Sequence, residues 1–89
     1  MKVEFDKSFL KSLGKIQDSK ILRKVEKVII DCESSSKISE IQNIKKLIGY
    51  SNYYRVKIGN YRIGFELVEK TVIRLIIITH RKDIYKRFP

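Results

Sequence analysis

Apolar and polar positions alternate most regularly between Tyr53 and Phe65, in the stretch YYRVKIGNYRIGF. Two runs rich in β-branched and aromatic residues flank Gly59-Asn60, a pair that suits a two-residue type II′ turn with glycine first. The pattern therefore predicts a β-hairpin in which the numbers of facing residues sum to 119. Because side chains alternate along a strand, one face of this hairpin is apolar. It comprises Tyr54, Val56, Ile58, Tyr61, Ile63 and Phe65.

The opposite face of the predicted hairpin carries cations around a glycine. Lys57 faces Arg62 across the ladder, and Arg55 faces Gly64. Like charges placed directly opposite each other destabilise a sheet, and local costs of this kind are typical of functional sites. A bound anion would relieve the repulsion, so this face is a candidate anion-binding site.

Before the hairpin, the pattern predicts a short strand over residues 2–5 and then two helices. Asp6 is placed to cap the first helix, and Gly14 weakens or ends it. Asp18 or Ser19 caps the second helix, whose apolar stripe indicates an αα-hairpin that packs on the sheet. The stripe consists of Ile21, Leu22, Val25, Val28, Ile29 and Cys32.

After the hairpin, the β-branched run from Thr71 to Thr79 predicts a buried central strand. Its register depends on the turn before it. A two-residue turn would bury Arg74, which is costly for an unpaired cation, so we expect a three-residue turn. That register turns Ile73, Leu75 and Ile77 toward the core.

Together these elements predict an α+β fold in one domain over residues 1–89. An N-terminal strand and an αα-hairpin pack on a mostly antiparallel four-stranded sheet, and a short helix over residues 83–88 ends the chain. Residues 38–50 are the least regular part and indicate a short helix or an irregular packed loop. A chain of 89 residues supports one small core.

Charge and cysteine content limit the classes of function and partner that the chain can have. The chain has 20 basic and 10 acidic residues, and residues 38–89 hold 11 of the basic ones but only 4 of the acidic ones. This excess favours nucleic acid or an acidic protein as partner. The single cysteine, interpreted as a buried residue, excludes an intramolecular disulfide and a cysteine-based metal site. The longest apolar run, Leu75–Ile78, is strand-sized, so we expect a cytoplasmic protein with no membrane partner.

Two stretches resemble the RelE/ParE superfamily of bacterial and archaeal toxins. They are KKLIGYSNYYRVKIGNYRIGF (Lys45–Phe65) and HRKDIYKRF (His80–Phe88), and the opening MKVEFDKSFLKSL is similar to the first strand and helix of that family. RelE-like members are endoribonucleases that cut messenger RNA in the ribosomal A site. ParE-like members lack the nuclease residues and inhibit DNA gyrase on a similar fold.

The resemblance implies the toxin of a type II toxin-antitoxin system, and more specifically a metal-independent, ribosome-dependent endoribonuclease. A ParE-like gyrase inhibitor and an inactive toxin-derived binding module are the alternatives. The retained cations and the C-terminal tyrosine favour the nuclease.

RelE-like enzymes work with lysine, arginine and tyrosine side chains. Arg55 and Lys57 match the two basic residues of the family before the turn. Arg62 matches the arginine after it, and Arg81 and Tyr85 match the C-terminal pair. Lys57 is the expected general base, because Arg55, where the best-known members carry lysine, stays protonated. The resemblance implies that Arg55 and Arg62 hold phosphates, that Arg81 stabilises the transition state or assists the leaving group, and that Tyr85 stacks on a base or orients the phosphate.

His80 has two interpretations. It is an acid/base group, as in some superfamily nucleases, or it ends the last strand and hydrogen-bonds the backbone. No cofactor or metal is expected, since the hairpin face offers cations and only Glu66 as an acid. Further cations are expected to bind RNA. They are Lys45, Lys46, Lys82, Lys86 and Arg87.

The implied partners are a cognate antitoxin, the ribosome and messenger RNA, and operator DNA for the toxin-antitoxin complex. The antitoxin is expected to wrap the toxin with an acidic, otherwise disordered segment, which the +10 charge attracts. In RelE-like pairs the antitoxin can also displace the C-terminal helix, here residues 83–88. We therefore expect this tail to be mobile in the free protein.

Overall fold

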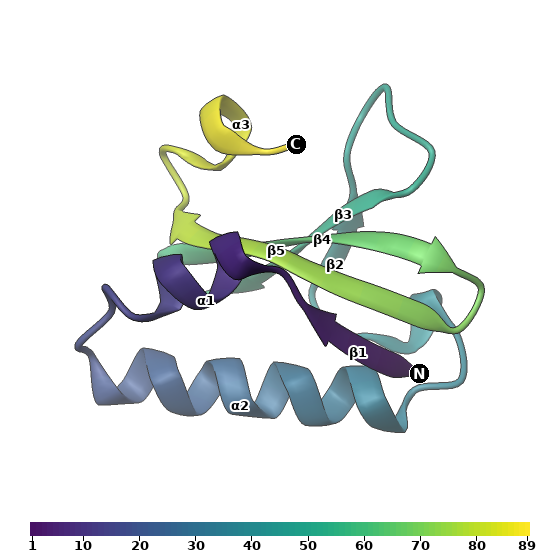
Figure 1. Cartoon of the computed structure of the whole chain (residues 1–89), viewed down its shortest axis with the longest axis horizontal. Helices are drawn as coiled ribbons and strands as arrows, with labels where there is room; N and C mark the ends of the chain where they lie inside the picture. Colours follow the sequence, from purple (N-terminus) through teal and green to yellow (C-terminus); the bar gives the residue numbers. More distant parts are fainter.

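The computed structural model describes all of residues 1–89. It has the predicted α+β architecture, in which α2 runs along one side of a twisted sheet and α3 lies on the other (Figure 1). The elements in chain order are β1 (Lys2–Phe5), α1 (Lys7–Leu13), α2 (Ser19–Ser34), a short 3-10 helix (Ile38–Glu40), β2 (Ile44–Lys46), β3 (Tyr53–Ile58), β4 (Tyr61–Glu69), β5 (Val72–His80) and α3 (Ile84–Arg87).

Both N-terminal helices begin after aspartates that the sequence indicates as caps. Asp6 Oδ2 accepts a hydrogen bond from the Ser8 N–H at 3.0 Å, and Asp18 Oδ1 accepts one from the Lys20 N–H at 2.9 Å. These bonds satisfy backbone donors that a helix start leaves free, and the bonds from Ser8 lower the pKa of Asp6. The first helix ends just before Gly14, as predicted.

The apolar stripe of α2 faces the sheet, as predicted. Ile21, Val25 and Cys32 are buried, whereas Leu22 at the edge of the stripe is 38% exposed. Burial, helped by the charge of Asp31, raises the pKa of Cys32 to about 11. This thiol is therefore protonated at neutral pH and lies in the core.

The sheet has five strands in the order β1-β5-β4-β3-β2, one more than predicted. β1 is parallel to β5, and all other neighbours are antiparallel. The additional strand, β2, forms in the least regular part of the sequence, where Ile44 pairs with Val56 and Lys45 pairs with Arg55. A strand of three residues is too short for its alternation to be recognised in the sequence.

A β-bulge in β5 changes the placement of Ile77. Ile73 and Leu75 are fully buried in the core, as predicted. The register then shifts at Ile76, so that Ile77 pairs with Gly64. Ile77 therefore faces the opposite side of the sheet, and the prediction that it joins the main core is wrong.

Helix α1 covers the edge of β5 at this bulge. β1 pairs with β5 only as far as Leu75. Beyond that point the Ser8 Oγ donates a hydrogen bond to the Ile76 carbonyl, and the Ile78 N–H donates one to the Ser12 Oγ at 3.0 Å. Two serines of α1 thus satisfy strand groups that would otherwise lack partners.

A second apolar cluster fixes the C-terminal tail to the far side of the sheet. Its buried members are Leu47, Ile77, Ile84 and Phe88. The Phe88 ring lies over Gly64, where an added Cβ would stand 2.7 Å from the ring Cδ2. The ring of Tyr53 meets it edge-on at a centroid distance of 5.5 Å. The sequence predicts a mobile tail in the free protein, whereas the structure packs the tail on the sheet through Ile84 and Phe88. Release of the tail would therefore expose both side chains.

We expect Gly64→Ala to destabilise the protein, because the new methyl group would overlap the Phe88 ring. Overpacking of this kind typically lowers the free energy of unfolding by about 1–3 kcal/mol. Gly14→Ala is the matched control, since its Cβ would lie 3.5 Å from its nearest neighbour and its φ of −62° suits alanine. Urea unfolding measures both variants. Amide hydrogen exchange over residues 84–88 should increase in Gly64→Ala alone, and unchanged exchange there would contradict the anchoring role of Phe88.

Candidate functional site

The hairpin has the predicted register, which places its cations on one face. Lys57 pairs with Arg62, and Arg55 pairs with Gly64. On the other face of the same strands, residues such as Ile63 are fully buried. The prediction that Lys57 and Arg62 point to the same side of the sheet is therefore confirmed.

Arg62 folds back over the hairpin turn. Its Nη1 donates hydrogen bonds to the carbonyls of Gly59 and Tyr61, both at 2.9 Å. The other guanidinium nitrogens of Arg62 have no partner in the protein, so they are available to a ligand.

Three further side chains act electrostatically on Arg62. Burial is the largest cause that lowers the pKa of Arg62, followed by the charges of Arg55 and Arg81, whereas Tyr85 raises it. Arg81 is held near the turn because its backbone N–H donates to the Asn60 carbonyl at 2.8 Å. Side chains from β3, the segment after β5, and α3 therefore lie close enough to Arg62 of β4 to act on its charge.

No carboxylate neutralises this group of cations. Both ion pairs of the chain involve Glu4, which lies on β1 at the opposite edge of the sheet. Glu66, the acid on the hairpin face, accepts a hydrogen bond from the Asn52 Nδ2 at 3.1 Å. The Nε of Arg55 is buried and has no hydrogen-bond partner. Because an unsatisfied buried donor is costly, an anion that reaches Arg55 and Arg62 would be strongly favoured.

The other predicted RNA-binding cations divide by position. Lys45 pairs with Arg55 and shares its face, whereas Lys46 pairs with Tyr54 and points to the other face of the strand. The cations of the tail are exposed and make no side-chain hydrogen bond. They are Lys82, Lys86 and Arg87.

His80 lies on the opposite face of the sheet from Arg62. It pairs with Tyr61, and the two rings meet edge-on at a centroid distance of 5.9 Å. Its Nδ1 accepts a hydrogen bond from the Lys82 N–H at 3.3 Å. This geometry matches the interpretation in which His80 ends the last strand and hydrogen-bonds the backbone.

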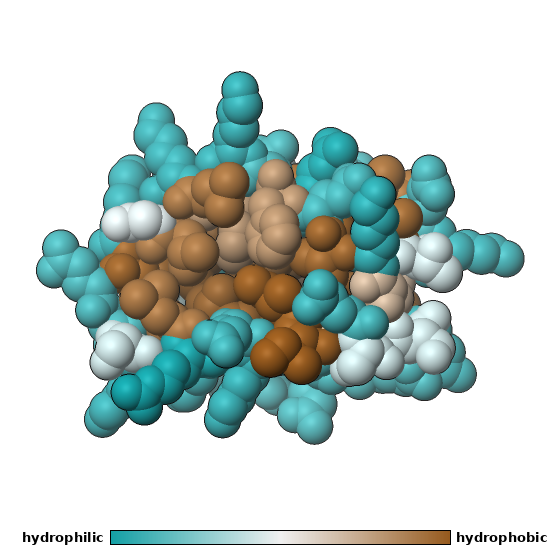
Figure 2. Space-filling view, turned by 60° about the horizontal axis from the view of Figure 1, so that its bottom comes forward, coloured by the Kyte–Doolittle hydropathy of each residue, from teal (hydrophilic) through white to brown (hydrophobic).

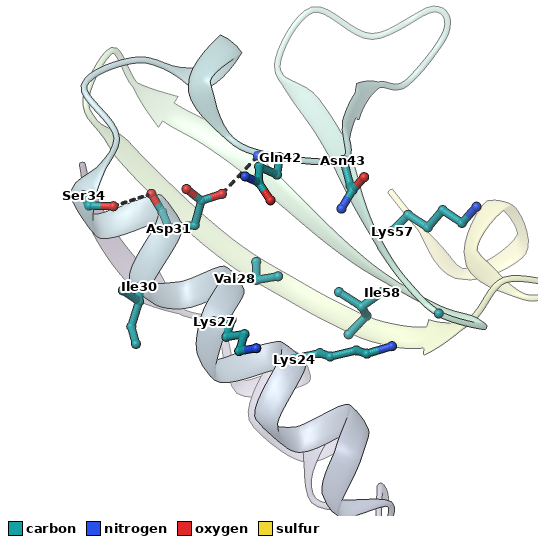
Figure 3. A pocket seen from close by; sticks show the side chains of 11 residues that line it. Lys24, Lys27, Val28, Ile30, Asp31, Ser34, Gln42, Asn43, Lys57 and Ile58 are labelled. Atoms are coloured by element: carbon teal, nitrogen blue, oxygen red, sulfur yellow. Dashed lines mark hydrogen bonds between the residues drawn. The ribbon is translucent and has the colours of Figure 1, made fainter.

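A cavity of about 500 Å³ lies between α2 and the chain that enters β2 (Figure 3). Asp31 spans its upper wall, where Oδ2 accepts a hydrogen bond from the Gln42 N–H at 3.0 Å. Lys57 borders this cavity, but its side chain leaves β3 on the side away from Val28 and Ile58 (Figure 3). The cavity is therefore separate from the group of cations around Arg62.

The helical side of the molecule carries exposed apolar surface (Figure 2). Phe5 of β1 is 45% exposed, Leu10 of α1 is 54% exposed, and Leu22 of α2 is 38% exposed. Extended apolar surface is typical of protein interaction sites. This helical surface lies on the other side of the sheet from the cations.

The sequence interpretation missed the contact of Phe88 with Gly64, which seats the helix that carries Tyr85. Gly64 itself contained the signal, since a glycine inside a strand often marks a place where another group approaches the backbone closely. The chain segment that fills this place lies 24 positions further on, so spacing alone did not identify it.

The sheet, its two-helix layer and the basic hairpin face together define a small toxin of the RelE/ParE type. Residues 3–85 match the model of the family described as ParE toxin of type II toxin-antitoxin system, parDE. The chain therefore belongs to this family of type II toxins.

Several relatives are similar over nearly the full chain. Toxin RelE3 of Methanocaldococcus jannaschii is 41% identical over 90 residues, which covers 100% of both chains. A chain of the RelB-RelE antitoxin-toxin complex from Methanococcus jannaschii is 38% identical, with a TM-score of 0.79 and coverage of 97% of this chain and 99% of the other. The intact RelBE toxin-antitoxin complex of E. coli shares the fold, with 24% identity, a TM-score of 0.69 and coverage of 89% and 94%.

We expect inorganic phosphate to raise the melting temperature of the protein, because it would bind among Arg55, Arg62 and Arg81, and binding to the folded state stabilises it. Arg62→Gln should lose most of this shift. Lys70→Gln is the matched control, since Lys70 is exposed in the turn at the other end of β4 and should leave the shift unchanged. Thermal unfolding at constant ionic strength measures the effect. An equal shift with chloride would show that the site has no preference for phosphate.

Proposed function

We propose that this toxin is a metal-independent endoribonuclease that cuts messenger RNA on the ribosome and so arrests translation. The observation that carries the proposal is the group of cations around Arg62. Lys57 pairs with Arg62 across the hairpin, the charges of Arg55 and Arg81 help to lower the pKa of Arg62, and no carboxylate forms an ion pair with any of these side chains. The full-length relatives named RelE support the same activity.

The proposed reaction is an internal transfer at one phosphodiester. The ribose 2′-oxygen attacks the adjacent phosphorus, the bond from phosphorus to the 5′-oxygen breaks, and a 2′,3′-cyclic phosphate and a 5′-hydroxyl remain. Lys57 takes the proton of the 2′-hydroxyl, and Arg55 and Arg62 stabilise the charge that develops on the phosphorane. Arg81 hydrogen-bonds the departing 5′-oxygen, which takes up a proton from water.

The remaining roles follow from position. Tyr85 is 66% exposed and stacks on a base of the RNA. Lys45 and the exposed cations of the tail bind the RNA backbone through charge. His80 is left out of the catalytic set, because it faces away from Arg62 and accepts a backbone hydrogen bond.

The proposed partner in regulation is an acidic antitoxin. The similar complexes from Methanococcus jannaschii and E. coli contain RelB, and the formal charge of +10 on this chain would speed the encounter with an acidic segment. The exposed apolar surface over β1, α1 and α2 offers such a segment a place to bury side chains. The resulting toxin-antitoxin complex is proposed to bind operator DNA.

Inhibition of DNA gyrase is the second candidate function. One observation favours it, namely that the matching family model is described as a ParE toxin. The cations around Arg62 favour the nuclease, since gyrase inhibition does not require a site that stabilises a phosphorane.

We expect Arg62→Ala and Arg81→Ala to abolish growth arrest, because each removes a group that stabilises the transition state. The loss of one such contact typically lowers the rate by about 10²–10³-fold, which corresponds to about 3–4 kcal/mol. Lys70→Ala should remain toxic. Sequencing of transcript ends after a short induction measures the cleavage. Intact transcripts together with inhibited DNA supercoiling would assign the gyrase function instead.

The antitoxin is expected to change the environment of the tail. Displacement of α3 by the antitoxin would increase amide hydrogen exchange over residues 84–88 in the complex, relative to the free toxin with its seated tail. Hydrogen exchange on both forms measures this. Strong protection of these residues in both states would show that the antitoxin neutralises the toxin by covering the site alone.

A further inference from the structure

A second cavity, of about 270 Å³, lies on the cation side of the sheet. The chain between β2 and β3 forms one wall with Leu47 and Tyr50, and the C-terminal tail forms the other with Tyr85 and Phe88. The remaining lining residues are Lys45, Lys46, Ile48 and Pro89.

This cavity adjoins the group of cations around Arg62. Lys45, at its rim, pairs directly with Arg55. Tyr85, on its far wall, is close enough to affect the pKa of Arg62. Phe88 lies over Gly64, the residue that pairs with Arg55. A phosphate bound by Arg55 and Arg62 would therefore have the cavity beside it.

The chemistry of the lining suits a flat, uncharged ring. Three aromatic side chains and Leu47 supply apolar surface, Lys45 lies at the rim, and the lining contains no acidic group. Tyr50 is 47% exposed and is supported edge-on by Tyr53, at a centroid distance of 5.5 Å. Cavities that enclose drug-sized ligands typically measure about 300–1,000 Å³, so a slightly smaller cavity suits a single ring system.

We propose that this cavity binds the nucleobase next to the cleaved bond and that Tyr50 is a stacking residue for it. The proposal rests on the function proposed above and adds a base-binding subsite to it. Tyr50 would contact the base from the wall opposite the tail. RNA bound in this way has its phosphate at Arg55 and Arg62 and its base between the two chain segments, which fixes the ribose between them.

The test uses fluorescein-labelled RNA trinucleotides that carry 2′-O-methyl groups and so cannot be cleaved. One set has all three bases, and each of three others has one abasic position. Fluorescence anisotropy at constant salt measures the affinity of the free toxin for each. Removal of the base that enters the cavity should weaken binding by roughly 5- to 100-fold, as for the loss of one aromatic stacking contact. Tyr50→Ala should remove this difference, and Tyr50→Phe should retain it.

Phe5→Ala is the matched control, because Phe5 is an aromatic residue of similar exposure, 45%, on β1 at the other edge of the sheet. This variant should distinguish the intact from the abasic trinucleotide as the wild type does. Equal affinity of the wild type for all four trinucleotides, or no binding of any of them, would overturn the proposal. Retained discrimination in Tyr50→Ala would do so as well.

The outcomes separate this subsite from the proposed nuclease function, since the binding assay needs no cleavage. Base discrimination in a toxin that leaves transcripts intact would contradict the nuclease and retain the subsite. Cleavage of transcripts without base discrimination would contradict only the subsite.

A short acidic peptide with one phenylalanine is the competing probe. One combination of results would assign the cavity to antitoxin binding instead. In it, the peptide displaces the trinucleotide from the wild type but not from Tyr50→Ala, and the wild type binds the intact and the abasic trinucleotides equally well.

Discussion

The site depends on the hydrophobic core under the hairpin, which keeps mutually repelling cations close together. Lys57 faces Arg62, and Arg55 and Arg81 add charge to the same region. In a free hairpin these cations would move apart. Here alternate residues of the same strands are buried in the core, so the strands cannot separate without exposing apolar side chains. The energy of the core thus keeps these cations together in the absence of a ligand, as the proposed anion site requires.

The contact of Phe88 with Gly64 links this site to the end of the chain. A glycine opposite Arg55 leaves room on the cation face, and the Phe88 ring fills part of that room. The same contact places α3 so that Tyr85 lies near Arg62. Substitutions at Gly64 are therefore expected to affect both the stability of the tail and the geometry of the site.

The hairpin could be predicted from the sequence because its two-residue turn determines which residues face each other. The helix caps could be predicted for the same reason, because Asp6 and Asp18 accept hydrogen bonds from residues only two positions further on. The bulge at Ile76 could not be predicted in this way, because it depends on α1, which reaches it from the other end of the chain. For the site, the hairpin register predicted that Arg55, Lys57 and Arg62 share one face. The face on which His80 lies depends instead on how β5 pairs with β4.

The tail is the part of the site that a partner can remove at the lowest cost. α3 has a single turn, and Ile84 and Phe88 are the only buried residues of the tail. Burial of one such side chain contributes about 1.5–3 kcal/mol, so release of the tail requires a few kcal/mol that a bound segment can supply by filling the same place over Gly64. That exchange would take away Tyr85 and one wall of the smaller cavity together, while Arg55 and Arg62 stay where the hairpin holds them. A partner that binds in this way would leave the proposed anion site without Tyr85, the proposed stacking residue.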